Sequence, residues 1–146
     1  MGLFDGFKQR AMGSLNEQQA IMTIVVAAVK ADESVSPEEI QRIKAMCVLS
    51  PIFASNSADQ DIANIRFADT MIEQFGEEAI VRAAEALTPE LRETAFAFAC
   101  DMVLADGVLG PSEERFMTGL AQKLGLRDDS AQAIVYATIV RNRALS

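Results

Sequence analysis

The sequence predicts an all-α fold, a single helical-bundle domain of about seven to eight helices over residues 1–146. Three observations predict it. Helix-start signals of the type Ser/Thr-Pro-acid recur, apolar residues between them follow the 3.6-residue period of an α-helix, and glycines follow the periodic segments. No Asn-Gly or Asp-Gly turn joins two segments of alternating apolar and polar residues, the pattern that marks a β-hairpin.

Start and stop signals divide the chain into elements. Ser36 is the N-cap of a capping box with Glu39 at N3 and Pro37 at N1. The other starts are Thr88-Pro89-Glu90, the weaker Gly110-Pro111 with Glu113, and the capping pair Asp128-Asp129 with Gln132, and the stops are Gly76, Gly107 and Gly125. These signals predict helices near residues 2–12, 16–32, 37–49, 58–75, 77–87, 89–106, 111–124 and 129–143.

Apolar spacing supports these helices, with one exception. The apolar faces of the last two helices are Phe116, Met117, Leu120 and Leu124, and Ala133, Ile134, Ala137 and Val140. The exception is IMTIVV at residues 21–26, because β-branched residues favour a strand.

An internal repeat resolves the exception. A shift of 74 residues without a gap aligns the segment from Met22 with the segment from Phe96. The identical positions are Val29, Ala31, Asp32, Pro37 and Glu39, which match Val103, Ala105, Asp106, Pro111 and Glu113. The second copy begins FAFACDMVLA, which is typical of a helix, so we expect the first copy to be helical too. The sequence therefore contains a helix–turn–helix hairpin twice, near 22–50 and 96–124, with a helical insert at 51–95.

The turns of the two hairpins, ADESVSPEE at 31–39 and ADGVLGPSEE at 105–114, carry a family resemblance. They resemble the paired A-D-G-x-[VL]-x-x-x-E hairpins of the TerB-like domain family, which includes the tellurite resistance protein TerB and the N-terminal domain of the co-chaperone DjlA. The opening MGLFDGFKQRA is also similar to the start of many TerB proteins. The resemblance implies an all-α domain whose hairpins are related by an approximate two-fold axis.

The resemblance also has implications for function. It implies a role in tellurite resistance or stress response without a catalytic step. It implies acidic positions that bind a divalent metal, which carry over to Asp32, Glu39, Asp106 and Glu113. One position departs from the family pattern, because Glu33 stands where the family usually has glycine.

Composition excludes several classes of function. The formal net charge is −8, and such a field repels nucleic acid. The chain has no histidine, which excludes Ser-His-Asp and Cys-His catalytic sites and histidine-ligated zinc. The two cysteines, Cys47 and Cys100, lie in apolar helical segments, where we expect buried and reduced thiols. A metal would therefore need oxygen ligands, which Ca²⁺ and Mg²⁺ prefer.

The acidic pairs have two interpretations. Glu39 and Glu113 fall in the first turn of a helix, whose dipole favours them. Asp32 and Asp106 fall near a helix C-terminus, whose dipole disfavours them, so a bound cation would stabilise them. On this interpretation the pairs form two equivalent acidic corners that bind Ca²⁺ or Mg²⁺ with modest affinity. Alternatively, each aspartate is only a turn residue and each glutamate only closes a capping box.

Location and partners follow from the apolar segments. The longest apolar run, at residues 20–29, is half the length of a membrane span and lies too far into the chain for a signal peptide. We therefore expect a cytoplasmic protein without a transmembrane segment, monomeric or weakly dimeric. Residues 2–12 have Leu3, Phe4 and Phe7 on one side, and we expect this amphipathic helix to dock on the domain, on a partner protein or on a membrane surface.

Three functions are compatible with the sequence. The first is a non-enzymatic TerB-like module of tellurite resistance or stress response that acts through partner proteins and has an acidic, divalent-cation-binding edge. The second is a purely structural interaction domain without metal, whose apolar groove, expected under residues 2–12, takes a partner helix. The third and least favoured is a metal-dependent hydrolase with oxygen ligands, because no Lys, Arg, Ser or Tyr converges on the four carboxylates in the sequence.

Overall fold

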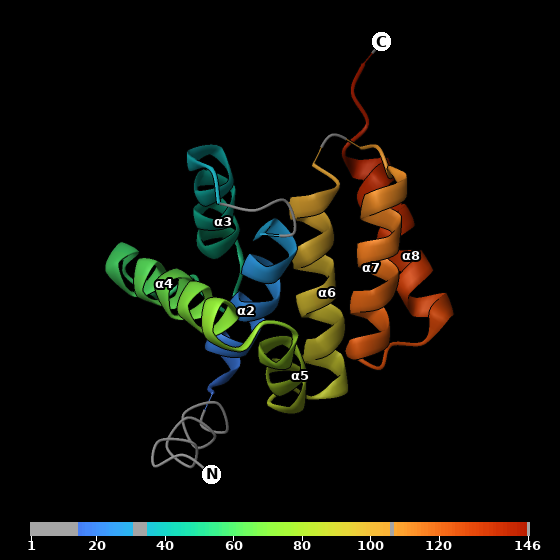
Figure 1. The fold of residues 1–146 in the computed structure, drawn as a ribbon. Coiled ribbons are helices and arrows are strands. Elements are labelled where there is room, and N and C mark those ends of the chain that lie inside the picture. Colours follow the sequence, from blue (N-terminus) through green and yellow to red (C-terminus); the bar gives the residue numbers. More distant parts are fainter. Residues whose placement is uncertain (1–14, 31–34, 106, 146) are drawn as a thin grey trace.

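The computed structural model describes residues 15–30, 35–105 and 107–145. The described part contains α2 (Glu17–Val29), α3 (Pro37–Leu49), α4 (Ala58–Phe75), α5 (Glu77–Glu85), α6 (Pro89–Val103), α7 (Pro111–Lys123) and α8 (Asp128–Arg141), and no strand (Figure 1). The predicted all-α class is confirmed. The predicted helix at 2–12 lies outside the described residues. No described helix combines the length and apolarity needed to cross a bilayer.

Helix α2 is the central helix because it is apolar on every side. All residues from Ala20 to Val29 are buried. The helix packs against α4, α5 and α6, and Figure 1 shows it among them. The β-branched residues at 21–26 are therefore helical, as the repeat predicted. Burial on all faces outweighs their modest preference for a strand.

Helix α6 joins this centre to the last two helices. It packs against α2 on one side and α8 on the other, and it also contacts α3 and α7. An ion pair of 2.6 Å between Arg141 and Asp101 ties α8 to α6. Figure 1 shows α7 and α8 beyond α6, on the side away from α4.

Most helix starts and stops follow the predicted signals. The capping box of Ser36 and Glu39 is present, and Thr88 caps α6 by accepting the backbone N–H of Leu91. Helix α6 ends at Val103, earlier than predicted. The predicted stops at Gly76, Gly107 and Gly125 all have positive φ, the conformation that favours glycine.

The predicted start of α8 is wrong. Its N-cap is Arg127, which makes no side-chain capping bond, so Asp129 lies in the first turn rather than at the cap. There the Asp129 carboxylate accepts the backbone N–H of Ser130 at 2.8 Å and pairs with Arg127 at 2.7 Å. The helix dipole also favours a carboxylate in this turn, so α8 begins earlier than a capping Asp129 would allow.

The apolar side chains of α8 stay largely at the surface. On the face predicted from their spacing, Ala133, Ala137 and Val140 are exposed and Ile134 is half-buried. The buried residues of α8 are Ala131 and Thr138. Because α8 packs mainly on α6, a groove stays open between α8 and α7.

The hairpin repeat has a counterpart in the helix bounds. Helix α7, Pro111–Lys123, has the bounds of α3, Pro37–Leu49, displaced by 74 residues. The approximate two-fold relation of the two hairpins in space stays a prediction.

Candidate functional site

A pocket of about 460 Å³ lies where the two predicted hairpins meet. Its walls come from the last turns of α2 and α6 and from the first two turns of α3 and α7. The residues that line it are Ala28, Val29, Glu39, Arg42, Met102, Val103, Ser112, Glu113 and Phe116. The pocket therefore brings together Glu39 and Glu113, two predicted site residues that are distant in the sequence.

Glu39 is oriented by its capping box. Its Oε1 accepts the backbone N–H of Ser36 at 2.9 Å, and its own N–H donates to Ser36 Oγ at 3.1 Å. Pro37 at N1 fixes the first turn without losing an intrahelical hydrogen bond. The box uses Oε1 of the carboxylate, and Oε2 has lone pairs of its own with which to accept a donor or a cation.

Glu113 is oriented differently at the equivalent position of α7. Its N-cap is Gly110, which makes no side-chain capping bond, so the prediction of a weaker start is confirmed. Glu113 Oε2 instead accepts the hydroxyl of Ser112 at 2.9 Å. A Cβ on Gly110 would lie only 2.8 Å from Glu113 Oε2. Glycine at this N-cap therefore leaves the space that the carboxylate occupies.

Four helix ends set the electrostatics of the pocket. Val29 and Val103, which line it, end α2 and α6, and a helix C-terminus carries about half a negative charge. The first turns of α3 and α7, which hold Glu39 and Glu113, carry the opposite partial charge. Among the described lining residues, Arg42 adds a full positive charge.

Arg42 and Ser112 correct one argument drawn from the sequence. The expectation that no Lys, Arg, Ser or Tyr converges on the carboxylates is wrong, because both residues line the pocket. Arg42 follows Glu39 by three residues, a spacing that puts the two on one face of a helix. This spacing was the signal that could have identified Arg42.

The two predicted aspartates, Asp32 and Asp106, lie outside the described residues. Beside the second one, Gly107 has φ +76°, so the left-handed turn residue of that hairpin is present. Within the described ranges, no three acidic or cysteine side chains gather as a metal centre. A complete ligand set at the pocket would therefore need the two aspartates, water or backbone carbonyls in addition to the glutamates.

The cysteines do not belong to this site. Cys47 and Cys100 are buried and free, as predicted. Burial, together with the nearby carboxylate of Asp61 at Cys47 and of Asp101 at Cys100, raises the pKa of each thiol to about 12. Both thiols are protonated at neutral pH, and a protonated thiol is not a metal ligand. The donors available at the pocket are oxygens.

Comparison with known proteins agrees with the resemblance of the hairpin turns. The family model described as tellurite resistance protein TerB matches residues 18–135. The chain belongs to the TerB family. The TerB match extends from the start of α2 into α8, so it contains both hairpins and the pocket between them. No curated protein and no solved structure matches the chain.

Proposed function

We propose that this TerB-family chain is a non-enzymatic module of tellurite resistance or stress response, which acts through partner proteins and binds a hard divalent cation, Ca²⁺ or Mg²⁺. The observation that carries the cation site is the shared pocket of Glu39 and Glu113. The sequence predicted two separate acidic corners, whereas the proposal has one site that both hairpins serve. The free, buried thiols of Cys47 and Cys100 suit a reducing compartment, and we propose that the module works in the cytoplasm.

The donor chemistry of the pocket fits such a cation. Glu39 and Glu113 would hold it through carboxylate oxygens, and Asp32 and Asp106 would add further oxygens from the adjoining turns. Ca²⁺ takes six to eight oxygen ligands and Mg²⁺ six, so water and backbone carbonyls would complete the shell. The bound ion would supply positive charge at the negative ends of α2 and α6. Because Arg42 already supplies positive charge in the pocket, the affinity for the cation should be modest.

A cation in this pocket would join the two hairpins. α3 and α7 each contact α6, and each contributes one of the two glutamates to the pocket. An ion bound to both glutamates would stabilise one arrangement of these helices. The function would then follow from the partner proteins that recognise this arrangement, without a chemical step on the chain itself.

Growth on tellurite tests the function. In cells that lack the gene, the wild-type chain should restore growth, and a chain with Glu39→Gln and Glu113→Gln should not. Glutamine at position 39 can still close the capping box, so the double change removes charge and keeps the helix start.

A matched control carries Glu38→Gln and Glu90→Gln, which remove two exposed first-turn carboxylates away from the pocket. This control should restore growth like the wild type. If the pocket variant also restores growth, the cation site has no part in resistance. If the wild-type chain itself fails, the role in tellurite resistance is wrong.

A further inference from the structure

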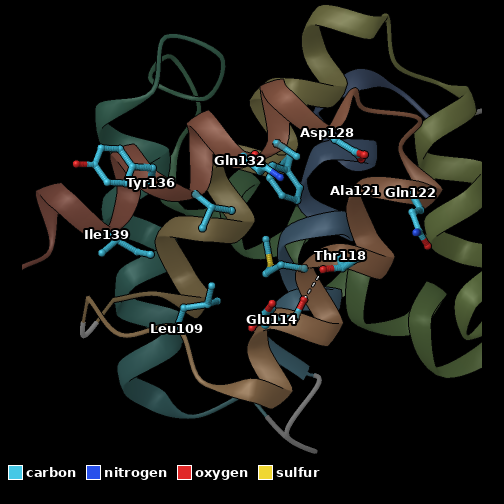
Figure 2. A pocket seen from close by; sticks show the side chains of 13 residues that line it. Leu109, Glu114, Thr118, Ala121, Gln122, Asp128, Gln132, Tyr136 and Ile139 are labelled. Carbon is cyan, nitrogen blue, oxygen red and sulfur yellow. Dashed lines mark hydrogen bonds between the residues drawn. The ribbon is translucent and has the colours of Figure 1, made fainter.

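The groove between α7 and α8 is an apolar surface that the chain leaves open. Its volume is about 520 Å³. Its apolar surface comes from the half-buried Leu109, Val135 and Ile139, above the buried side chains of Phe96 and Met117. Figure 2 shows Glu114, Thr118 and Ala121 along one wall and Gln132, Tyr136 and Ile139 along the other. The lining residues extend over more than two turns of each helix, so the groove is long enough to contact two turns of an additional helix.

The charged residues of the groove are acidic. Glu114 of α7 and Asp128 of α8 line it, and none of the described lining residues is Lys or Arg. Both carboxylates are exposed. The whole chain has a formal net charge of −8. Such a surface attracts a partner with positive charge and repels an acidic one.

Tyr136 marks the outer edge of the groove. Its side chain is 65 % exposed, and in Figure 2 its hydroxyl group points away from the groove. Tyrosine is enriched at protein interfaces because it combines a large apolar ring with a polar end.

Gly119 is an independent indication of a partner. It lies in the interior of α7, where glycine is among the least favourable residues. It lines a second hollow, which shares Glu114, Thr118 and Gln122 with the groove and is also lined by Pro111 and Arg115. A Cβ on Gly119 would meet no atom within 4 Å, so packing within the described chain does not require glycine. Close approach of another backbone is a physical reason for glycine in a helix.

We propose that the groove between α7 and α8 binds a basic amphipathic helix of a partner protein. The apolar face of that helix packs against Val135 and Ile139, its lysines or arginines face Glu114 and Asp128, and its backbone passes close to Gly119. The inference rests on the proposed function in one respect, that the module acts through partner proteins. It does not depend on the cation, because the groove and the cation pocket share no lining residue.

Two synthetic helical peptides test the proposal against the full chain. One has leucines at positions i, i+3, i+4 and i+7 with lysines on the opposite face, and the other replaces the lysines with glutamates. Fluorescence anisotropy should show saturable binding of the lysine peptide, at least tenfold tighter than the glutamate peptide. Gly119→Leu should weaken this binding at least tenfold, because a side chain then fills the hollow, while the melting temperature stays unchanged or rises.

Charge variants separate groove binding from general attraction. Glu114→Gln with Asp128→Asn should weaken binding about threefold to tenfold. Glu17→Gln with Asp59→Asn removes the same charge from exposed first turns outside the groove and should leave binding unchanged. Equal binding of both peptides, or no effect of Gly119→Leu, overturns the proposal.

Two further results would assign the groove to another occupant and also overturn the proposal. One is displacement of the lysine peptide by a peptide of residues 1–14 at a lower concentration than the lysine peptide itself requires. The other is a dimer in sedimentation that Gly119→Leu converts to monomer. A cation titration of the groove variants should match the wild type in every case, so failure here leaves the proposed cation site unaffected.

Discussion

Arg42 is the residue that distinguishes the pocket from a purely acidic one. Among the described lining residues it is the basic side chain, and it shares a face of α3 with Glu39. A resident positive charge opposes the entry of a cation and lowers its affinity. The pocket would then bind a divalent ion only where the ion is abundant.

This role of Arg42 gives the first prediction. Arg42→Gln should raise the affinity for Ca²⁺ or Mg²⁺ about threefold to tenfold, because one opposing charge at a partly exposed site is removed. Isothermal titration calorimetry measures the change. Lys44→Gln removes the same charge from α3 outside the pocket and should leave the affinity unchanged. An affinity that falls in Arg42→Gln would contradict the role, since Arg42 would then be supporting the site.

The buried thiols give the second prediction, a loss of stability at alkaline pH. The folded-state pKa of Cys47 and Cys100 is raised from 9.0 to about 12, mainly by burial. Below pH 9 the thiols are protonated in both states. Above it the unfolded chain loses these protons first, so the free energy of unfolding falls as the pH rises from 9 to 12.

Denaturant unfolding between pH 8 and pH 11 measures this loss. A chain with Cys47→Ala and Cys100→Ala should start at a lower stability, because buried volume is lost, and should fall less steeply with pH. Equal slopes for the two chains would show that the thiols are not responsible.

At the scale of elements, two glycines of the second hairpin, Gly107 and Gly119, have opposite roles. Gly107 has φ +76°, and a Cβ there would lie 2.6 Å from the backbone oxygen of Asn142. Gly119 has open space around its Cα. Gly107 is required by the turn and its packing, whereas packing within the described chain does not require Gly119, which lowers the helix propensity of α7.

The third prediction compares alanine at both positions. Gly107→Ala should lower the free energy of unfolding by at least about 1–2 kcal/mol, because alanine is strained at positive φ and also collides with the end of α8. Gly119→Ala should leave stability unchanged or raise it by up to about 1 kcal/mol. Thermal unfolding followed by circular dichroism measures both. A Gly107→Ala chain as stable as the wild type would contradict the tight contact between this turn and α8.

The helices themselves were largely predictable, because their signals are local. Ser36-Pro37 with Glu39, and Thr88-Pro89, specify a helix start by chemistry that lies within one turn, and both are present. The predicted start of α8 was wrong because Asp129 can accept a neighbouring backbone N–H and pair with an arginine from within the first turn. Sequence spacing does not distinguish these two uses of an aspartate.

At the scale of the whole molecule, the central position of α2 could have been predicted from its composition, but the shape of the grooves could not. A helix apolar on every side can only be buried, yet the run at 20–29 was compared only with the length of a membrane span and the position of a signal peptide. The open space between α7 and α8 depends on how closely two helices pack on α6, which apolar spacing alone does not determine. The exposed Ala133, Ala137 and Val140 are the result.

The candidate site was also predictable in part, because the turns that carry its glutamates are local but the packing that brings them together is not. The repeat identified Glu39 and Glu113 as equivalent, because both hairpins carry the same turn. That the two residues line one pocket depends on the packing of α3 and α7 around α6, which the sequence does not specify. Asp32 and Asp106 remain predicted ligands.

The shared pocket is the central claim, and calorimetry with single variants tests it most directly. Ca²⁺ and Mg²⁺ would be titrated into the wild type, Glu39→Gln, Glu113→Gln and the control Glu38→Gln with Glu90→Gln. If both glutamates hold one ion, each single variant should weaken every binding event at least tenfold, and the control should match the wild type. Separate corners would instead leave half of the binding at native affinity in each single variant, and the absence of any binding heat in the wild type would contradict the cation site altogether.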